Sequence, residues 1–182
     1  MKILKILLIA LGTLVLIGGA GYLYASSGIK TKPGYADMGS VSVDSNNAML
    51  SVSVGPGGVK PLRWLFEKAL EHSDHSSQIP EEMLRGALGK LQGVQLRVFD
   101  SSNKRDLFDR AISETAAALK QKQWQTLMTV RDEEEHIVVL QYLDQQQIAG
   151  LSIMASTPEK ALFLNLIGPF DAESIASTVN EL

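Results

Sequence analysis

The second half of this sequence contains four apolar runs that follow one another with only short polar breaks. The runs WQTLMTV, HIVVLQYL, IAGLSIMA and ALFLNLI are separated by RDEEE, DQQQ and STPEK. Each run has the length of a strand, and polar breaks this short suit hairpin connections. The pattern predicts an antiparallel meander of four strands between residues 124 and 167.

Elsewhere the chain mixes strands with helices. Residues 48–54 (AMLSVSV) and 94–99 (VQLRVF) are two further predicted strands. Apolar residues at helical spacing, with a proline or a capping residue at the start, predict amphipathic helices. These helices cover residues 61–70, 80–91, 104–121 and a closing helix over 171–182. Because strands and helices do not alternate regularly, we predict the α+β class, with amphipathic helices packed on one face of a largely antiparallel sheet.

The N-terminal segment is apolar enough to enter a membrane. Residues 6–24 contain no charge, and a helix of that length spans about 28 Å, close to the thickness of a bilayer core. Tyr22 and Tyr24 stand where an aromatic belt would lie. A cleaved signal peptide stays open as the alternative, because small residues at 18–20 and 25–27 offer cleavage sites.

These features predict three regions: an anchor or signal segment (1–25), a linker (26–47) and an extracytoplasmic α+β domain (48–182). Two lysines flank each side of the apolar segment, and the N-terminal amine adds to the short side. We therefore expect a single-pass membrane protein with its N-terminus inside and its body outside, or a protein that is secreted after cleavage.

The charge distribution argues against nucleic acid as a partner. The formal net charge is -3, and the only charges in the first 32 residues are four lysines, so the excess of acid lies in the predicted domain. An acidic domain repels a phosphate backbone. The chain has no cysteine, which excludes disulfides, thiolate catalysis and cysteine zinc sites.

From residue 91 onward the sequence resembles a known bacterial family. The features that match are LQGVQLRVF, the helix RDLFDRAISETAAAL, the run WQTLMTVRDEEEHIVVLQYLDQQQIAGLSIMA and the late strand LFLNLIGPFD. They are similar to domain of unknown function family 4252, a family of small exported proteins. The resemblance implies a bacterial envelope protein, sometimes associated with sigma-factor or anti-sigma regulation, and it implies no catalytic residues. Together with the apolar N-terminal segment, it leads us to expect a single-pass inner-membrane protein with its body in the periplasm, or a protein secreted to the periplasm after signal cleavage. Many members are lipoproteins, whereas this chain lacks the cysteine that would carry a lipid.

His72, Asp74 and His75 are the strongest candidates for a metal site. A helix would place the two histidines, three residues apart, on one face. The surrounding serines and Gln78 instead favour a solvated loop, and His136 is the only other histidine. We therefore predict no metal site.

The other motifs in the sequence do not match known phosphate-binding, calcium-binding or catalytic patterns. The segments VGPGGVKP and GALGKL lack the spacing of a phosphate-binding loop. The acidic run 132–135 lacks the spaced ligands of a calcium loop and is predicted to be a charged hairpin tip. No nucleophile elbow is present, and Ser152 lies inside a predicted strand. The sequence predicts no enzyme and no cofactor.

Two functions remain open. The first is a membrane-anchored, non-catalytic envelope domain, regulatory or protein-binding, that meets a protein partner through the exposed face of the meander or through Arg63 and Trp64. An exposed tryptophan is a natural interface anchor, whereas Trp124 begins a strand and is expected to cap the core. The alternative is a carrier of a small apolar ligand or lipid.

Overall fold

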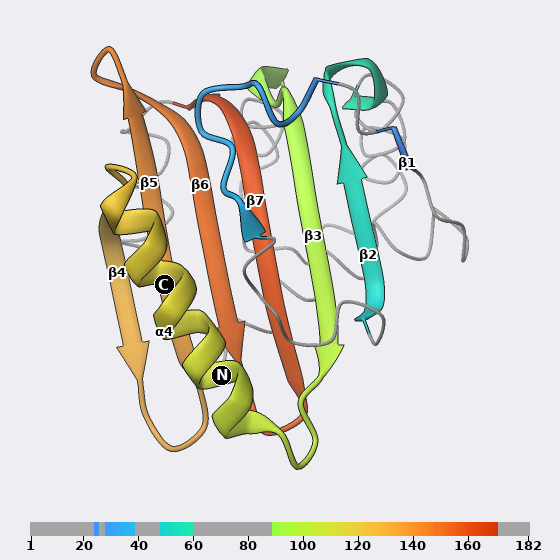
Figure 1. Ribbon diagram of the computed structural model, residues 1–182, viewed down its shortest axis with the longest axis vertical. Helices are drawn as coiled ribbons and strands as arrows, with labels where there is room; N and C mark the ends of the chain where they lie inside the picture. The colour runs from blue at the N-terminus through green and yellow to red at the C-terminus, as the bar shows by residue number, and fades with distance from the viewer. Residues whose placement is uncertain (1–23, 26–27, 39–47, 60–88, 171–182) are drawn as a thin grey trace, which may run out of the picture.

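The computed structural model describes residues 24–25, 28–38, 48–59 and 89–170 of the chain (Figure 1). They contain one seven-stranded sheet and a long helix that crosses it. The elements are β1 (Tyr24–Ala25), β2 (Ala48–Val54), β3 (Gly93–Asp100), α4 (Arg105–Gln121), β4 (Gln125–Arg131), β5 (His136–Asp144), β6 (Gln147–Ser156) and β7 (Lys160–Phe170). Along the sheet the strands lie in the order β1-β2-β3-β7-β6-β5-β4.

The four apolar runs of the second half form the consecutive antiparallel strands β4 to β7. In the turn between β4 and β5, the carboxylate of Asp132 accepts hydrogen bonds from the N–H groups of Glu135 at 2.7 Å and Glu134 at 2.8 Å. These two bonds hold the pKa of Asp132 below its usual value. The prediction that the acidic run forms a hairpin tip is confirmed, because residues 132–135 connect the antiparallel strands β4 and β5.

Strand β7 joins the two halves of the chain. It pairs with β6 on one side and antiparallel with β3 on the other, from Gly93 opposite Ile167 to Asp100 opposite Lys160. Strand β2 pairs antiparallel with β3, and the two residues of β1 add to β2 in parallel. β7 also continues through Pro169, where the sequence predicts its end.

Helix α4 carries the chain from the end of β3 to β4 at the far edge of the sheet (Figure 1). The helix predicted over 104–121 is confirmed. Asp106 in its first turn and Lys120 in its last turn complement the helix dipole. Its buried stripe consists of Phe108, Ala111, Ile112, Thr115, Ala116 and Leu119.

Each face of the sheet has its own core. On the face covered by α4, Phe163 of β7 meets Phe99 edge-on with ring centroids 5.9 Å apart, and Phe99 lies 5.4 Å from Phe108. On the opposite face, here called the second face, Leu162 and Leu164 of β7 are buried among other aliphatic residues. Both faces of β7 are thus buried, which explains its nearly continuous apolar sequence.

The predicted fold class is wrong. The described residues are mostly an antiparallel sheet of six strands with the two-residue β1 at one edge, and α4 is the only complete helix among them. The prediction of several helices on one face of a sheet considered each segment of the sequence separately. In the structure, β3 precedes α4 in the sequence and pairs with β7, which follows it, so that the strands form one large sheet. Local hydrophobic periodicity does not indicate pairing between strands that are far apart in the sequence.

Several predictions lie outside the described residues. They concern the apolar segment 6–24 apart from Tyr24, the helix over 61–70, most of the helix over 80–91 and the closing helix over 171–182. In the part of the chain that the structure describes, no helix is long and apolar enough to cross a membrane. The division into anchor, linker and domain stays a prediction.

Candidate functional site

Residues 28–38, here called the strap, lie across the sheet on the same face as α4. Figure 1 draws them in blue, in front of the sheet. Ala36 and Met38 are fully buried in the core of that face. The guanidinium of Arg97 donates a hydrogen bond to the carbonyl of Met38 at 3.2 Å. This part of the predicted linker 26–47 therefore contributes to the core of the domain.

The side chain of Asn165, in the middle of β7, binds the strap. Its Oδ1 accepts a hydrogen bond from the N–H of Ala36 at 3.0 Å, and its Nδ2 donates to the carbonyls of Gly34 and Leu151, both at 3.1 Å. Asn165 is fully buried, so water does not compete for these bonds. A single side chain thus satisfies three backbone groups, two from the strap and one from β6.

Two glycines allow the strap to touch β6. A Cβ added to Gly34 would overlap the backbone of Ala149, and one added to Gly150 would overlap the backbone of Gly34. Gly34 also has a φ of 80°, in the left-handed region that favours glycine. The strap therefore packs on β6 backbone to backbone.

A polar cluster links α4 to β5 and β6. The carboxylate of Asp109 accepts a hydrogen bond from the hydroxyl of Ser156. The same carboxylate lies 3.5 Å from Nδ1 of His136 and 3.8 Å from Nε of Arg105. Ser, His and Asp meet here, but the serine hydroxyl bonds the carboxylate and not the imidazole. Through Asp109 the cluster connects α4 to Ser156 of β6 and His136 of β5.

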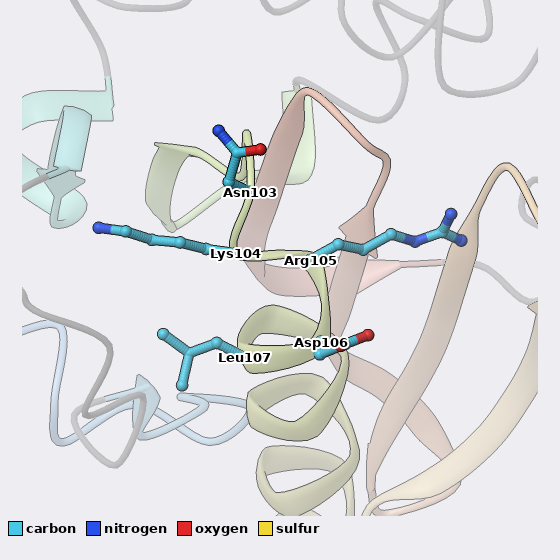
Figure 2. Close-up of a pocket in the computed structure, with 5 residues that line it drawn as sticks. All are labelled: Asn103, Lys104, Arg105, Asp106 and Leu107. Carbon is cyan, nitrogen blue, oxygen red and sulfur yellow. The ribbon is translucent and has the colours of Figure 1, made fainter.

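An open hollow lies at the N-terminus of α4, lined by residues 103–107 (Figure 2). Figure 2 shows the side chains of Lys104 and Leu107 pointing to one side and those of Arg105 and Asp106 to the other. The guanidinium of Arg105 donates to two backbone carbonyls of the β4–β5 turn. One of the residues that line the hollow, Arg105, therefore connects the N-terminus of α4 to the β4–β5 turn.

The last feature is the outer side of β4, here called the β4 edge. Among the described strands β4 has β5 on one side and no neighbour on the other. A β-bulge between Thr126 and Met128 contains Leu127, whose side chain is 40% exposed. Met128 and Val130 are half-buried on the second face. An edge strand presents unpaired N–H and C=O groups that a further strand can bind.

Five of the candidate site residues considered in the sequence analysis lie outside the part of the chain that the structure describes. Arg63 and Trp64, the predicted interaction residues, lie outside the described residues, as do His72, Asp74 and His75. Among the described residues, no group of three or more His, Asp or Glu side chains could hold a metal ion.

Two further sequence candidates lie within the described residues. Trp124 is buried and packs on Tyr142 with ring centroids 5.6 Å apart, which confirms its predicted place in the core. Ser152 is fully buried on β6, and its hydroxyl makes no hydrogen bond within the described structure.

Sequence reasoning missed the strap and its binding residue. Asn165 is the one polar residue in the apolar run ALFLNLI. A single amide side chain on a strand that is buried on both faces requires a hydrogen-bond partner for each of its polar atoms. The isolated asparagine in an apolar run was therefore the feature of the sequence that could have indicated a binding partner for this strand. Nothing in the sequence indicates that His136 would meet Asp109, because the two residues lie on different elements.

The protein-family model described as Domain of unknown function (DUF4252) matches residues 41–178. The match covers more than half of the chain, so the protein belongs to this family, as the resemblance in its second half predicts. Strands β2 to β7 and helix α4 lie inside the matched region, and the strap precedes it. No curated protein matches the chain.

Proposed function

We propose that this chain is a non-catalytic protein-binding domain that its N-terminal segment attaches to the inner membrane, with its body in the periplasm, and that it binds its partner through the β4 edge. The single observation that carries the proposal is the β4 edge, which no other described strand covers and where Leu127 is exposed at the centre of β4. Such an edge can add a strand from another chain, with backbone hydrogen bonds for affinity and side chains for specificity.

The position of the β4 edge relative to the predicted anchor supports this function. The apolar segment 6–24 runs directly into β1, which forms one edge of the sheet, and β4 forms the other edge. Six spacings between neighbouring strands correspond to roughly 29 Å. A membrane attached at β1 would therefore leave the β4 edge free for a partner.

The exposed side chains along β4 also suit a binding surface. Leu127 offers an apolar contact, while Gln125 and Thr129, both exposed, offer hydrogen-bonding groups. Protein interfaces combine an apolar centre with a polar rim in this way. The proposal needs no catalytic group, and the Asp109–His136–Ser156 cluster serves in it to hold α4 on the sheet.

The test uses the full chain in its membrane. Because the protein has no cysteine, Leu127→Cys introduces a unique thiol that can carry a photoactivatable crosslinker. Irradiation is expected to yield a discrete adduct of higher mass. Ala117→Cys, on the exposed side of α4, is the matched control. An equal yield of adducts from both positions would refute the β4 edge as the binding surface.

Two parallel measurements address the remaining parts of the proposal. Recovery of the protein in the membrane fraction after an alkaline wash is expected for the anchored form, whereas a soluble chain that begins near residue 26 would show the cleaved form. Native mass spectrometry that finds a co-purifying lipid would favour the alternative function, a carrier of an apolar ligand.

A further inference from the structure

We infer that the partner at the β4 edge is a second copy of this chain, whose β4 pairs antiparallel with the first and extends the sheet across a two-fold axis. The inference rests on the proposed function, because it names the occupant of the surface proposed there. Two features of β4 support a second copy: the opposite charges at the two ends of the strand and the side chains at its centre.

The two ends of β4 carry opposite charge. Lys120 and Lys122 are exposed just before the strand, and the exposed Asp144 offsets only one of them. The turn that follows the strand presents the exposed acids of residues 132–134, of which Arg131 and the turn-bound Arg105 offset two. The start of β4 is therefore positive and its end negative.

This polarity selects the orientation of a second copy. In an antiparallel pair, the acidic turn of each chain approaches Lys120 and Lys122 of the other, so opposite charges meet at both ends. A parallel pair would bring lysines to lysines and acids to acids, which is repulsive. A two-fold axis uses the same patch on both chains, and a strand with one positive and one negative end complements itself in this arrangement.

The centre of the strand supplies the apolar contact. Leu127 is exposed near the middle of β4, so an antiparallel pair places both copies of it close to the axis. On the second face, Met128 and Val130 are half-buried and would gain the same side chains of the neighbour. Pairing would also satisfy the backbone groups along the outer side of β4, and the regular stretch after the bulge offers them in sequence.

The first experiment is disulfide crosslinking of the full-length protein in membranes. Mild oxidation of Leu127→Cys is expected to yield a species with the mass of two chains, whereas Ala117→Cys yields far less. If the photocrosslinker at position 127 captures a different protein and the oxidised thiol gives no dimer, the second copy is ruled out while the β4 edge stands as a binding surface. If neither method gives a product above the control, both the inference and the proposed function fail.

The second experiment exchanges the charges. Lys122→Glu alone and Glu134→Lys alone each place like charges at both ends of the pair and are expected to reduce the disulfide dimer of Leu127→Cys about fivefold. A mixture of the two variants restores opposite charges at both ends, so the mixed dimer is expected to form at the level of the parent. A mixture that crosslinks no better than the separate variants would refute the antiparallel arrangement. Circular dichroism of each variant checks that the fold is retained.

Discussion

Gly34 of the strap and Gly150 of β6 lie in direct backbone contact, and neither position has room for a side chain. A Cβ on either residue would overlap backbone atoms of the opposing segment, which cannot move aside as a flexible side chain can. Asn165 binds the strap at the same place, through the carbonyl of Gly34. The glycine contact and the amide together determine where the strap lies on the sheet.

The glycine contact predicts a specific cost for one methyl group. Gly150→Ala is expected to lower the free energy of unfolding by about 2–3 kcal/mol, because the strap must shift to relieve the overlap. Urea denaturation measures the change. The matched control is Gly57→Ala, where an added Cβ meets nothing within 4 Å in a helical segment. Equal stability of the two variants would contradict the close packing of the strap.

Removal of the Asn165 amide should release the strap. Asn165→Ala removes three hydrogen bonds to buried backbone groups, two of which belong to the strap, so we expect a loss of about 3 kcal/mol in the free energy of unfolding. Trypsin provides a local readout, because Lys30 lies within the strap and is followed by Thr31, whereas Lys32 precedes Pro33 and is resistant to trypsin. Cleavage after Lys30 should be faster in the variant than in the exposed control Gln121→Ala. Unchanged cleavage would show that Asn165 does not hold the strap.

The second face of the sheet should be as important for stability as the face under α4. Leu164→Ala on β7 removes a side chain that is 3% exposed, and a loss of about 3 kcal/mol is expected from the lost burial and the cavity. Leu107→Ala removes a side chain that is 44% exposed and should cost less than about 1 kcal/mol. Thermal or urea denaturation of both variants tests the difference, and similar losses would argue against a second core.

The β4–β5 turn should respond to acid through Asp132. The N–H groups of Glu135 and Glu134 lower the pKa of this carboxylate from 3.8, so its ionised form stabilises the folded state. That contribution is fully present above pH 3.8 and is lost as the pH falls through the lowered pKa of the folded state. Asp132→Asn removes the contribution. The difference in urea midpoint between parent and variant should therefore shrink between about pH 5 and pH 2.

The exposed Asp144→Asn serves as the charge-matched control for this measurement. A stability difference for Asp132→Asn that stays constant over the acid range would show that the hydrogen bonds of the turn do not depend on the ionised carboxylate.

The strands could be predicted well because their sequences carry the information locally. Alternation in AMLSVSV predicts β2 at its observed bounds, Ala48–Val54, and the polar breaks mark the turns between β4 and β7. The size of the sheet could not be predicted in this way. The size of the sheet depends on the pairing of β3 with β7, in which Val94 lies opposite Leu166. These two strands are separated in the sequence by α4 and three other strands, and no local pattern specifies that they pair.

The strap was missed for a different physical reason. Its fold is not periodic, and its composition of Gly, Lys and Pro is typical of a linker. Its position depends on Asn165, which lies far away in the sequence. The candidate binding surface was equally hidden, because the place of β4 at the edge of the described sheet follows from the strand order and not from the sequence of β4 itself.

The attachment of the strap has a mechanical consequence. A tensile force applied at the N-terminus would first act on the few hydrogen bonds of β1 and on those that Asn165 makes, well before it acts on the long ladder between β3 and β7. Detachment of the strap would release about 36–40 Å of chain while the rest of the sheet stays intact. The domain would then extend under load by detachment of the strap before its sheet comes apart.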